Sequence, residues 1–342
     1  MINLLDLVAL ATVCDVVPLI EDNRVFVNYG LQIIKQGQRE GLKALLEVSG
    51  VDKNRISSTN LGFHLGPRIN AAGRLDDACI ALELMNNVYE EAFNKAKILH
   101  EHNQERQSLE EEILLEACLE IDENNIHKDK KILVLYNEKW HHGVVGIVAS
   151  RLAEKYHKPS IVIGENKKGS GRSIKGIDLH AMVSLTKEHL NAFGGHFHAI
   201  GLSLKSLVDE FRNALDSVIK SHIDDKIFEP IVFYEQEINL SVIDHKLIKK
   251  IKLFEPFGAS NPYPVFRINN CFMKNIKQLN GGHLKGENFQ DNNTISFIAF
   301  RTPMMDIMLN KPLDILAILE ENTWQNQTTI QMRIVDYKLS EK

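Results

Sequence analysis

The chain has 342 residues, of which 44% are hydrophobic and 25% charged, and its formal net charge is −5. This length suffices for two or three domains with separate cores, and the composition is that of a soluble globular protein. No apolar run is long enough to span a membrane, and the slight acidity gives no support to a uniformly basic nucleic-acid binder, although a local basic patch would suffice. We expect a cytoplasmic protein without a disulfide framework or cysteine zinc site, because the four cysteines form no Cys-x-x-Cys pair.

The N-terminal stretch, residues 1–20, is apolar apart from a few positions, chiefly Asp6 and Asp15. A helix that is apolar on most sides is buried, and a carboxylate within it needs a partner or a metal ion. We expect this stretch to come from the interior of a domain whose beginning is missing. Two amphipathic helices are predicted to follow, over residues 26–36 and 40–48.

A glycine-containing stretch then carries Arg68, Asn70 and Arg74. A guanidinium group can hold a phosphate through two parallel hydrogen bonds, so two arginines six residues apart predict an anion-binding segment. The alternative is that Arg74 forms a surface ion pair with one of the acidic residues that follow it, Asp76 or Asp77.

A long helical pattern, almost free of glycine and proline, covers residues 78–122, and such a helix often connects two domains. The pattern then changes to short apolar strands, at 132–136 and 160–163, separated by a helix at 144–156. Further helices are predicted at about 178–190 and 204–222. This alternation is typical of an α/β domain in which helices cover a sheet.

Two glycine-rich stretches of this domain predict a pocket for a phosphorylated ligand. The first is a loop formed by Gly169, Ser170, Gly171, Arg172 and Ser173, and the second is a turn that contains Gly194, Gly195 and His196. Small residues let the backbone approach a ligand, serine hydroxyls donate hydrogen bonds, and arginine holds phosphate. Each stretch alone is equally well explained as a tight turn, but the two together favour a site.

Two histidines of the second stretch admit another interpretation. His196 and His198 are two positions apart, so on an extended segment they point to the same side and could share a metal ion. No third ligand is near them in the sequence, which makes a role for His196 in supporting phosphate contacts the preferred interpretation.

The C-terminal part is rich in short strands, which are predicted at 231–234, 265–268, 296–300, 313–319 and 328–337. With one helix at about 241–254, this pattern predicts a small β-barrel of the OB type. Such barrels commonly bind single-stranded nucleic acid through a basic groove and stacking aromatic side chains. A purely structural β-domain is the alternative.

Taken together, these stretches resemble the RecJ family, the single-strand-specific DNA exonucleases of the DHH phosphoesterase superfamily. The resemblance rests on the order and combination of six segments, residues 6–19, 66–76, 140–151, 169–173, 194–203 and 256–266. It implies an α/β plus β-barrel fold in four parts. These are the end of a DHH-type catalytic domain (1–85), a connecting helix (86–125), a DHHA1 domain (126–222) and an OB-type barrel (223–342).

The resemblance also implies a function, 5′→3′ exonuclease activity on single-stranded DNA in repair and recombination, with Mn²⁺ or Mg²⁺ as cofactor. Single-stranded DNA is the expected partner, and a single-strand-binding protein is a further one. The resemblance makes Asp15 a metal ligand. It places His196 either beside the scissile phosphate or in a hydrogen bond to a metal-bound water. The remaining family positions would hold the 5′-phosphate and the strand: Arg68, Asn70, Arg74, Ser170, Gly171, Arg172, Ser173, Gly194 and Gly195. Lys167, Lys168 and Lys175 would contact the DNA backbone, whereas Trp140 either stacks on a base or, as we prefer, packs in the core.

The chain departs from the family in its metal ligands. The first three metal-site motifs are missing, since none of the fourteen histidines stands in an Asp-His-His sequence and His141-His142 follows Trp140. One carboxylate cannot hold two metal ions. We therefore expect the chain to bind single-stranded DNA but to hydrolyse it poorly or not at all.

Two other functions remain open. The chain is either a non-catalytic binding module or the C-terminal half of a nuclease completed by a separate N-terminal DHH polypeptide. A small-nucleotide phosphodiesterase of the same superfamily is a third possibility, against which the long helix and the barrel argue.

Overall fold

The computed structural model describes residues 4–75, 77–302, 311–324 and 327–341. The chain divides into two compact units, each made of separate segments of sequence. One unit comprises residues 1–36, 54–62 and 231–342, and the other comprises residues 37–53 and 63–230. No described helix is both long and apolar enough to cross a membrane.

The second unit is built on the long helix α7 (Tyr89–Glu123). Three helices pack against its first half, namely α3 (Glu40–Val48), α5 (Gly66–Leu75) and α6 (Cys79–Asn86). The predicted helix over 78–122 is therefore two helices, because the backbone becomes extended at Asn87 and Val88. The second half of α7 buries Ile113, Ala117 and Ile121 against the α/β domain. The short α8 (Ile126–Asp129) leads into that domain.

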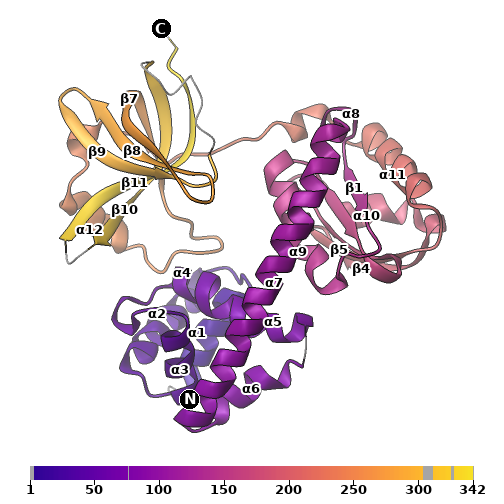
Figure 1. Cartoon of the computed structure of the whole chain (residues 1–342). Helices are drawn as coiled ribbons and strands as arrows, with labels where there is room; N and C mark the ends of the chain where they lie inside the picture. Colours follow the sequence, from indigo (N-terminus) through magenta and orange to yellow (C-terminus); the bar gives the residue numbers. More distant parts are fainter. Residues whose placement is uncertain (1–3, 76, 303–310, 325–326, 342) are drawn as a thin grey trace. The chain divides into compact units, whose positions relative to one another are not determined.

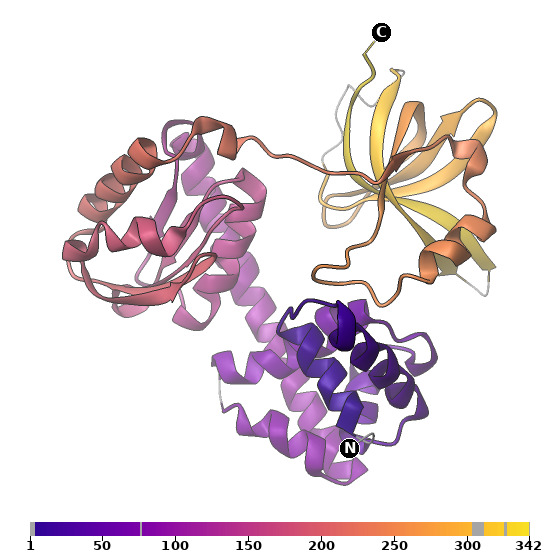
Figure 2. The ribbon, with the colours of Figure 1, turned by 180° about the vertical axis from the view of Figure 1, so that it is seen from behind.

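The α/β domain contains a five-stranded sheet in the order β1-β2-β3-β5-β4. Its strands are β1 (Leu133–Tyr136), β2 (Ser160–Ile163), β3 (Lys168–Arg172), β4 (Leu190–His196) and β5 (Ala199–Leu204). The first two strands are parallel and the other neighbours are antiparallel. Figure 1 and Figure 2 show this domain from opposite sides.

Different helices cover the two faces of this sheet. On one face, α10 (Leu179–Ser184) and α11 (Val208–His222) enclose a core that contains Ile161, Ile200 and Phe211. On the other face, α9 (His142–Tyr156) and α7 pack on β1 and β2, and α9 also reaches β3. In the strand order, β5 and β4 follow β3, and the contacts of α9 with the sheet are mainly to β2 and β3.

Two of the sequence predictions for this domain were wrong. The predicted loop at 169–173 is the central strand β3, and the predicted turn at 193–203 is the hairpin of β4 and β5. Glycine and serine have low strand propensity, which hid both segments. Hydrogen bonding to strands on either side overrides that propensity.

The barrel belongs to the first unit and consists of β7 (Val265–Leu279), β8 (His283–Gln290), β9 (Asn293–Ala299), β10 (Leu313–Trp324) and β11 (Gln327–Leu339). Pairing of β10 with β7 and parallel pairing of β11 with β9 close it. The short β6 (Gln236–Glu237) pairs with β7 in parallel, and α12 (His245–Lys252) packs on the barrel. The α/β plus β-barrel fold predicted from the sequence is confirmed.

Two strands of the barrel differ from the prediction. Residues 231–234 form no strand, and β8 is a strand that the sequence did not predict. Two buried positions of β8 are the polar residues Asn288 and Gln290. The strand therefore lacks the usual alternation of buried apolar and exposed polar residues. The side-chain Oε1 of Gln290 accepts a hydrogen bond from the Leu240 N–H, which allows the side-chain amide to be buried.

The rest of the first unit is helical, with α1 (Leu5–Cys14), α2 (Glu21–Gln36) and the single turn α4 (Ser58–Asn60). Gly30 of α2 faces α1 directly, where an added Cβ would lie 2.4 Å from the Ala9 Cβ. The α1 sequence is apolar on all sides, yet Leu4 and Val8 keep exposed side chains.

Candidate phosphate-binding groove

Two arginines from distant parts of the chain lie over the first turns of α9. The Arg74 Nη1 donates a hydrogen bond of 3.1 Å to the Gly143 carbonyl. A Cβ at Gly143 would lie only 2.5 Å from the Arg74 carbonyl oxygen, so glycine is needed for α5 to approach this closely. One turn along the helix, a Cβ at Gly146 would lie 3.4 Å from the Arg172 Nη2. The two glycines of α9 thus bring both guanidinium groups to one place.

Arg74 is exposed and Arg172 half-buried, but neighbouring protein atoms partly desolvate both guanidinium groups. Desolvation lowers the pKa of Arg172, and the charge of Arg74 lowers it further. Desolvation also lowers the pKa of Arg74, with a further contribution from Arg106 that Glu110 partly offsets. Within the described part of the chain, neither Arg74 nor Arg172 forms an ion pair, and each donates to a backbone carbonyl. Two neighbouring cations that form no ion pair with a carboxylate of the described residues favour binding of an anion such as phosphate.

The carboxylate of Glu110, in the middle of α7, is already engaged. Its Oε2 accepts a hydrogen bond of 2.6 Å from Arg106, and its Oε1 accepts one of 3.0 Å from Arg151 of α9. Arg106 also donates to the Asn103 Oδ1 at 2.9 Å. Asn103, Arg106 and Glu110 are buried, so part of the polar surface of this helix does not face solvent. Their spacing of three and four residues places them on one helix face, which is the sequence signal for such a network.

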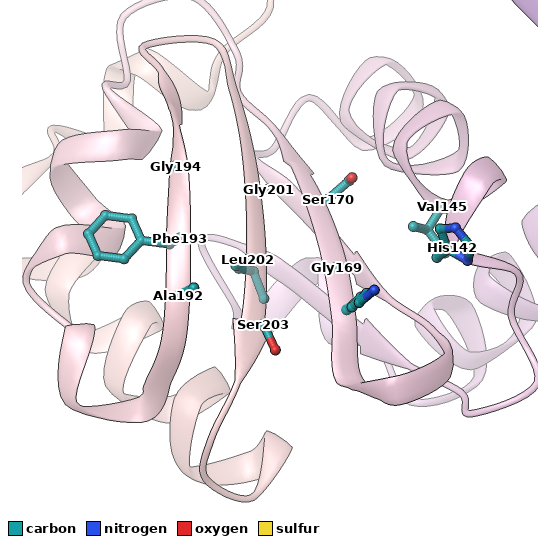
Figure 3. A pocket seen from close by; sticks show the side chains of 11 residues that line it. His142, Val145, Gly169, Ser170, Ala192, Phe193, Gly194, Gly201, Leu202 and Ser203 are labelled. Atoms are coloured by element: carbon teal, nitrogen blue, oxygen red, sulfur yellow. The ribbon is translucent and has the colours of Figure 1, made fainter. Parts of the chain in front are cut away.

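A groove of about 520 Å³ runs beside the arginine pair on the open part of the sheet. Figure 3 shows Ser170, Gly201 and Gly194 on adjacent strands, with His142 and Val145 of α9 across from Ser170. The first three are register partners, so they form one row across β3, β5 and β4.

The floor of this groove is flat because it consists of small residues. A Cβ added to Gly194 or to Gly201 would meet no atom of the described residues within 4 Å. Internal packing therefore does not require glycine at either position. Room for a ligand against the backbone is a physical reason for it.

The other predicted residues of the first glycine-rich stretch have internal roles. Gly171 is buried, and a Cβ there would lie 2.7 Å from the Ile200 Cγ1. The Ser173 hydroxyl donates to the Ile177 carbonyl at 2.7 Å. Because side chains alternate along β3, Ser170 and Arg172 lie on one face of the sheet, whereas Gly171 faces the core on the other.

The predicted residues of α5 behave differently from one another. Arg68 donates to the His64 carbonyl at 2.6 Å and to the His100 Nδ1 at 3.1 Å, so it is held by its own unit. Asn70 is exposed. The alternative ion pair of Arg74 with Asp77 is not formed, since Asp77 accepts a hydrogen bond from the Cys79 N–H. Asp76 lies outside the described residues.

At the end of β4, Gly195 and His196 form part of the hairpin. Gly195 has a φ of +146°, and a Cβ there would lie 2.2 Å from the Ala199 carbonyl oxygen. His196 is exposed and shares a register row with Ala199 and Arg172. The His196 and His198 rings are 6.3 Å apart, edge to face, and the described residues add no third ligand to them.

The remaining predicted contacts concern Trp140 and three lysines. Trp140 is 3% exposed and its Nε1 donates to the Glu116 Oε2 at 2.7 Å, which confirms the preferred core role. Lys168 lines the groove, and Lys175 is exposed nearby in sequence. Lys167 is half-buried.

Comparison with known proteins finds two matching domain families, a DHHA1 domain at residues 129–221 and a RecJ OB domain at residues 234–336. The single-stranded-DNA-specific exonuclease RecJ of Bacillus subtilis is 31% identical over 99% of this chain and 44% of that protein. RecJ of Haemophilus influenzae is 33% identical over 98% of this chain and 61% of that protein. A crystal structure of Thermus thermophilus RecJ in complex with Mn²⁺ matches with a TM-score of 0.85 and 27% identity, covering 100% of this chain and 50% of that one.

The chain belongs to the RecJ family. It matches the C-terminal portion of RecJ and spans about half the length of the RecJ proteins just described. The resemblance inferred from the order of the motifs is therefore confirmed. The arginine pair lies between α5 and the DHHA1 domain, within one compact unit.

The residues of this chain do not fit the metal site expected from the RecJ resemblance. Two Thermus thermophilus RecJ structures are complexes with Mn²⁺ or Mg²⁺. Here Asp15 is an exposed residue at the C-terminal end of α1. In the described part of the chain, the one group of three or more side chains suited to a metal consists of His141, His142 and Glu165, and it does not include Asp15. No catalytic step can therefore be built on metal ligands among the residues that the structure describes.

Proposed function

We propose that this chain binds single-stranded DNA along the groove and holds a 5′-terminal phosphate between Arg74 and Arg172. One observation carries the proposal, namely two neighbouring, partly desolvated guanidinium groups without a carboxylate partner among the described residues. A terminal phosphate carries more charge than an internal phosphodiester, so this pair would favour the end of a strand. The Ser170 hydroxyl, on the same face, would add a neutral donor.

The groove suits the nucleotides that follow such a phosphate. Its floor is made by Gly194 and Gly201, which admit a sugar or base against the backbone. Lys168 at its side would contact a phosphate. His196, on the register row of Arg172, would lie farther along the same face.

The barrel offers a second surface for a single strand. The Lys274 Nζ lies 3.6 Å from the centre of the Phe289 ring, and Phe272 is the cross-strand neighbour of Phe289. Lys277 and Lys285 are likewise paired across β7 and β8. Aromatic rings with interspersed cations are the usual means by which OB folds bind single-stranded nucleic acid.

The proposed function of the complete protein is 5′→3′ exonuclease activity on single-stranded DNA, in repair and recombination. We propose that this chain alone hydrolyses DNA poorly, because Asp15 is the single carboxylate assigned to the metal site. A separate N-terminal DHH polypeptide would supply the other ligands, and a single-strand-binding protein is a further proposed partner. The proposed boundaries of the four parts are those given above, 1–85, 86–125, 126–222 and 223–342.

The test is binding of oligonucleotides that differ only in their 5′ end. Arg172→Ala and Arg74→Ala should each weaken binding of the 5′-phosphorylated strand about 10- to 100-fold, since a hydrogen bond to a charged group contributes about 1.5–3 kcal/mol. Binding of the 5′-hydroxyl strand should change much less. Fluorescence anisotropy at fixed salt measures both.

The matched control is Arg212→Ala, which removes an arginine already paired with Asp209. It should leave the preference for the 5′-phosphate unchanged. Equal losses for both strands in the Arg74 and Arg172 variants would show that these side chains do not recognise the end. Nucleotide release by the purified chain alone, at rates typical of an enzyme, would contradict the proposed inactivity.

A further inference from the structure

Three side chains that commonly bind transition metals converge at the edge of the groove. His141 and His142 lie at the N-terminal end of α9, and Glu165 lies just after β2. One possible ligand atom from each lies within 4.8 Å of the other two. His142 also lines the groove, so an ion held here would border the proposed path of the ligand.

The backbone fixes this convergence independently of the three side chains. The Glu165 N–H donates to the Trp140 carbonyl at 3.0 Å, which joins the two segments directly before the histidines. A Cβ at Gly164 would lie 2.1 Å from the same carbonyl oxygen, so glycine is needed for the segments to come this close. Trp140 is itself buried in the core. The site is therefore built on rigid elements.

The contacts of Glu165 leave part of its carboxylate available. Its Oε1 accepts a hydrogen bond from the His142 N–H at 3.2 Å and lies 2.7 Å from the His142 Nδ1. Hydrogen bonding by His142 lowers the pKa of Glu165, which keeps the carboxylate ionised. The described residues place no hydrogen-bond donor on Oε2, so that oxygen is free to coordinate an ion.

The two histidine rings are stacked, with centres 4.8 Å apart and an angle of 28° between their planes. The His141 Nδ1 accepts a hydrogen bond from the Gly143 N–H at 3.1 Å. Coordination by His141 would either replace this hydrogen bond or require a change of tautomer. The site is thus suited to an exchangeable ion and not to a permanent structural one.

We propose that His141, His142 and Glu165 form a binding site for a divalent transition-metal ion, of which Zn²⁺ is the representative. Two imidazoles and one carboxylate are a donor set that holds Zn²⁺ with a fourth position open. A phosphate oxygen of a ligand in the groove would occupy that position. The site is separate from Asp15, and its existence does not depend on the proposed function.

The experiment is titration of the metal-free full-length chain with Zn²⁺ by calorimetry and with Co²⁺ by visible absorption, in the absence of DNA. His142→Ala and Glu165→Gln should each weaken the tightest binding event at least tenfold and remove the Co²⁺ absorption bands. Thermal melting without metal confirms that each variant is folded. Since no DNA is present, failure of this proposal is distinct from failure of the groove to bind a strand.

The chain provides a matched control in His245, whose Nδ1 lies 3.4 Å from the Glu321 Oε1. In the described part of the chain no second histidine joins this pair to form a metal group. His245→Ala should therefore titrate like the unmodified chain. If His142→Ala and Glu165→Gln leave both titrations unchanged, or if His245→Ala causes the same loss, His142 and Glu165 form only an ion pair and the proposed site does not exist.

Discussion

Neighbouring glycines of the groove are present for different physical reasons. Gly195 adopts a φ of +146° and has no room for a side chain, because an added Cβ would lie 2.2 Å from the Ala199 carbonyl oxygen. Gly194 and Gly201 have ordinary φ values and open space where a Cβ would stand. The fold therefore explains the first glycine but not the other two, for which we propose contact with a ligand lying on the sheet.

This difference predicts the effect of adding one methyl group at each position. Gly194→Ala and Gly201→Ala should leave the free energy of unfolding unchanged or raise it by about 0.4–1 kcal/mol, because alanine restricts the unfolded chain. Both should weaken binding of single-stranded DNA, since the methyl group raises the groove floor. Gly195→Ala, the control, should lower stability by about 1–3 kcal/mol through backbone strain. Urea unfolding and anisotropy measure these effects, and unchanged DNA affinity in both groove variants would contradict the assignment of the floor.

At the residue scale, the sequence predicted which residue types bind phosphate better than it predicted where each residue lies in the fold. Arg172 and Arg74 were proposed as partners, and they lie together. Gly171 and Ser173 stand in the same stretch, yet one packs against Ile200 and the other bonds its own loop. If this stretch is interpreted as a loop, the sequence does not tell which of its residues face the groove and which face the core. That distinction follows from the alternation of side chains along a strand, and so requires that β3 be recognised as one.

At the element scale, Glu110 connects α7 with α9 and so fixes the two helices that flank the arginine pair. It accepts hydrogen bonds from Arg106 and Arg151, and both Glu110 and Arg106 are more than nine-tenths buried. Removing one partner of a buried pair leaves an uncompensated charge, so Glu110→Ala should lower the free energy of unfolding by about 3–5 kcal/mol. Chemical denaturation measures this loss.

An exposed ion pair of the same unit serves as the control for this prediction. Glu40 and Lys43 are 3.4 Å apart, and their side chains are 42% and 48% exposed. Glu40→Ala should therefore cost no more than about 1 kcal/mol. Similar losses in the two variants would mean that the link between α7 and α9 is not the source of the stability.

The errors in predicted elements share one cause. Propensity and apolar periodicity find the long helices and the strands with Val, Ile and Leu, but they miss strands made of glycine or of buried amides. The strand β3 is Lys-Gly-Ser-Gly-Arg, and β8 buries Asn288 and Gln290. Such strands are defined by hydrogen bonds to their neighbours, which are distant in sequence.

At the scale of the whole molecule, the compact units do not follow the order of the chain. The unit that contains the barrel also includes residues 1–36 and 54–62. The Leu19 N–H donates to the Ala259 carbonyl at 2.7 Å, and the Ser58 hydroxyl donates to the Phe257 carbonyl at 2.6 Å. These contacts join the segment that follows Asp15, and α4, to the loop before β7. A linear division into domains does not describe this connection.

Leu19 provides the test of that connection. It is 1% exposed, and Gly258 packs on it so closely that an added Cβ would lie 2.7 Å from its Cδ1. Leu19→Ala should lower stability by about 2–5 kcal/mol through lost burial and a cavity, and should speed amide exchange in residues 254–261. Leu253→Ala, at a side chain that is 78% exposed, should do neither. Because Leu19 contacts the loop before β7 and belongs to the same unit, amide exchange in β1–β5 of the other unit should stay unchanged. Faster exchange in β1–β5 without faster exchange in residues 254–261 would contradict the division into these two units.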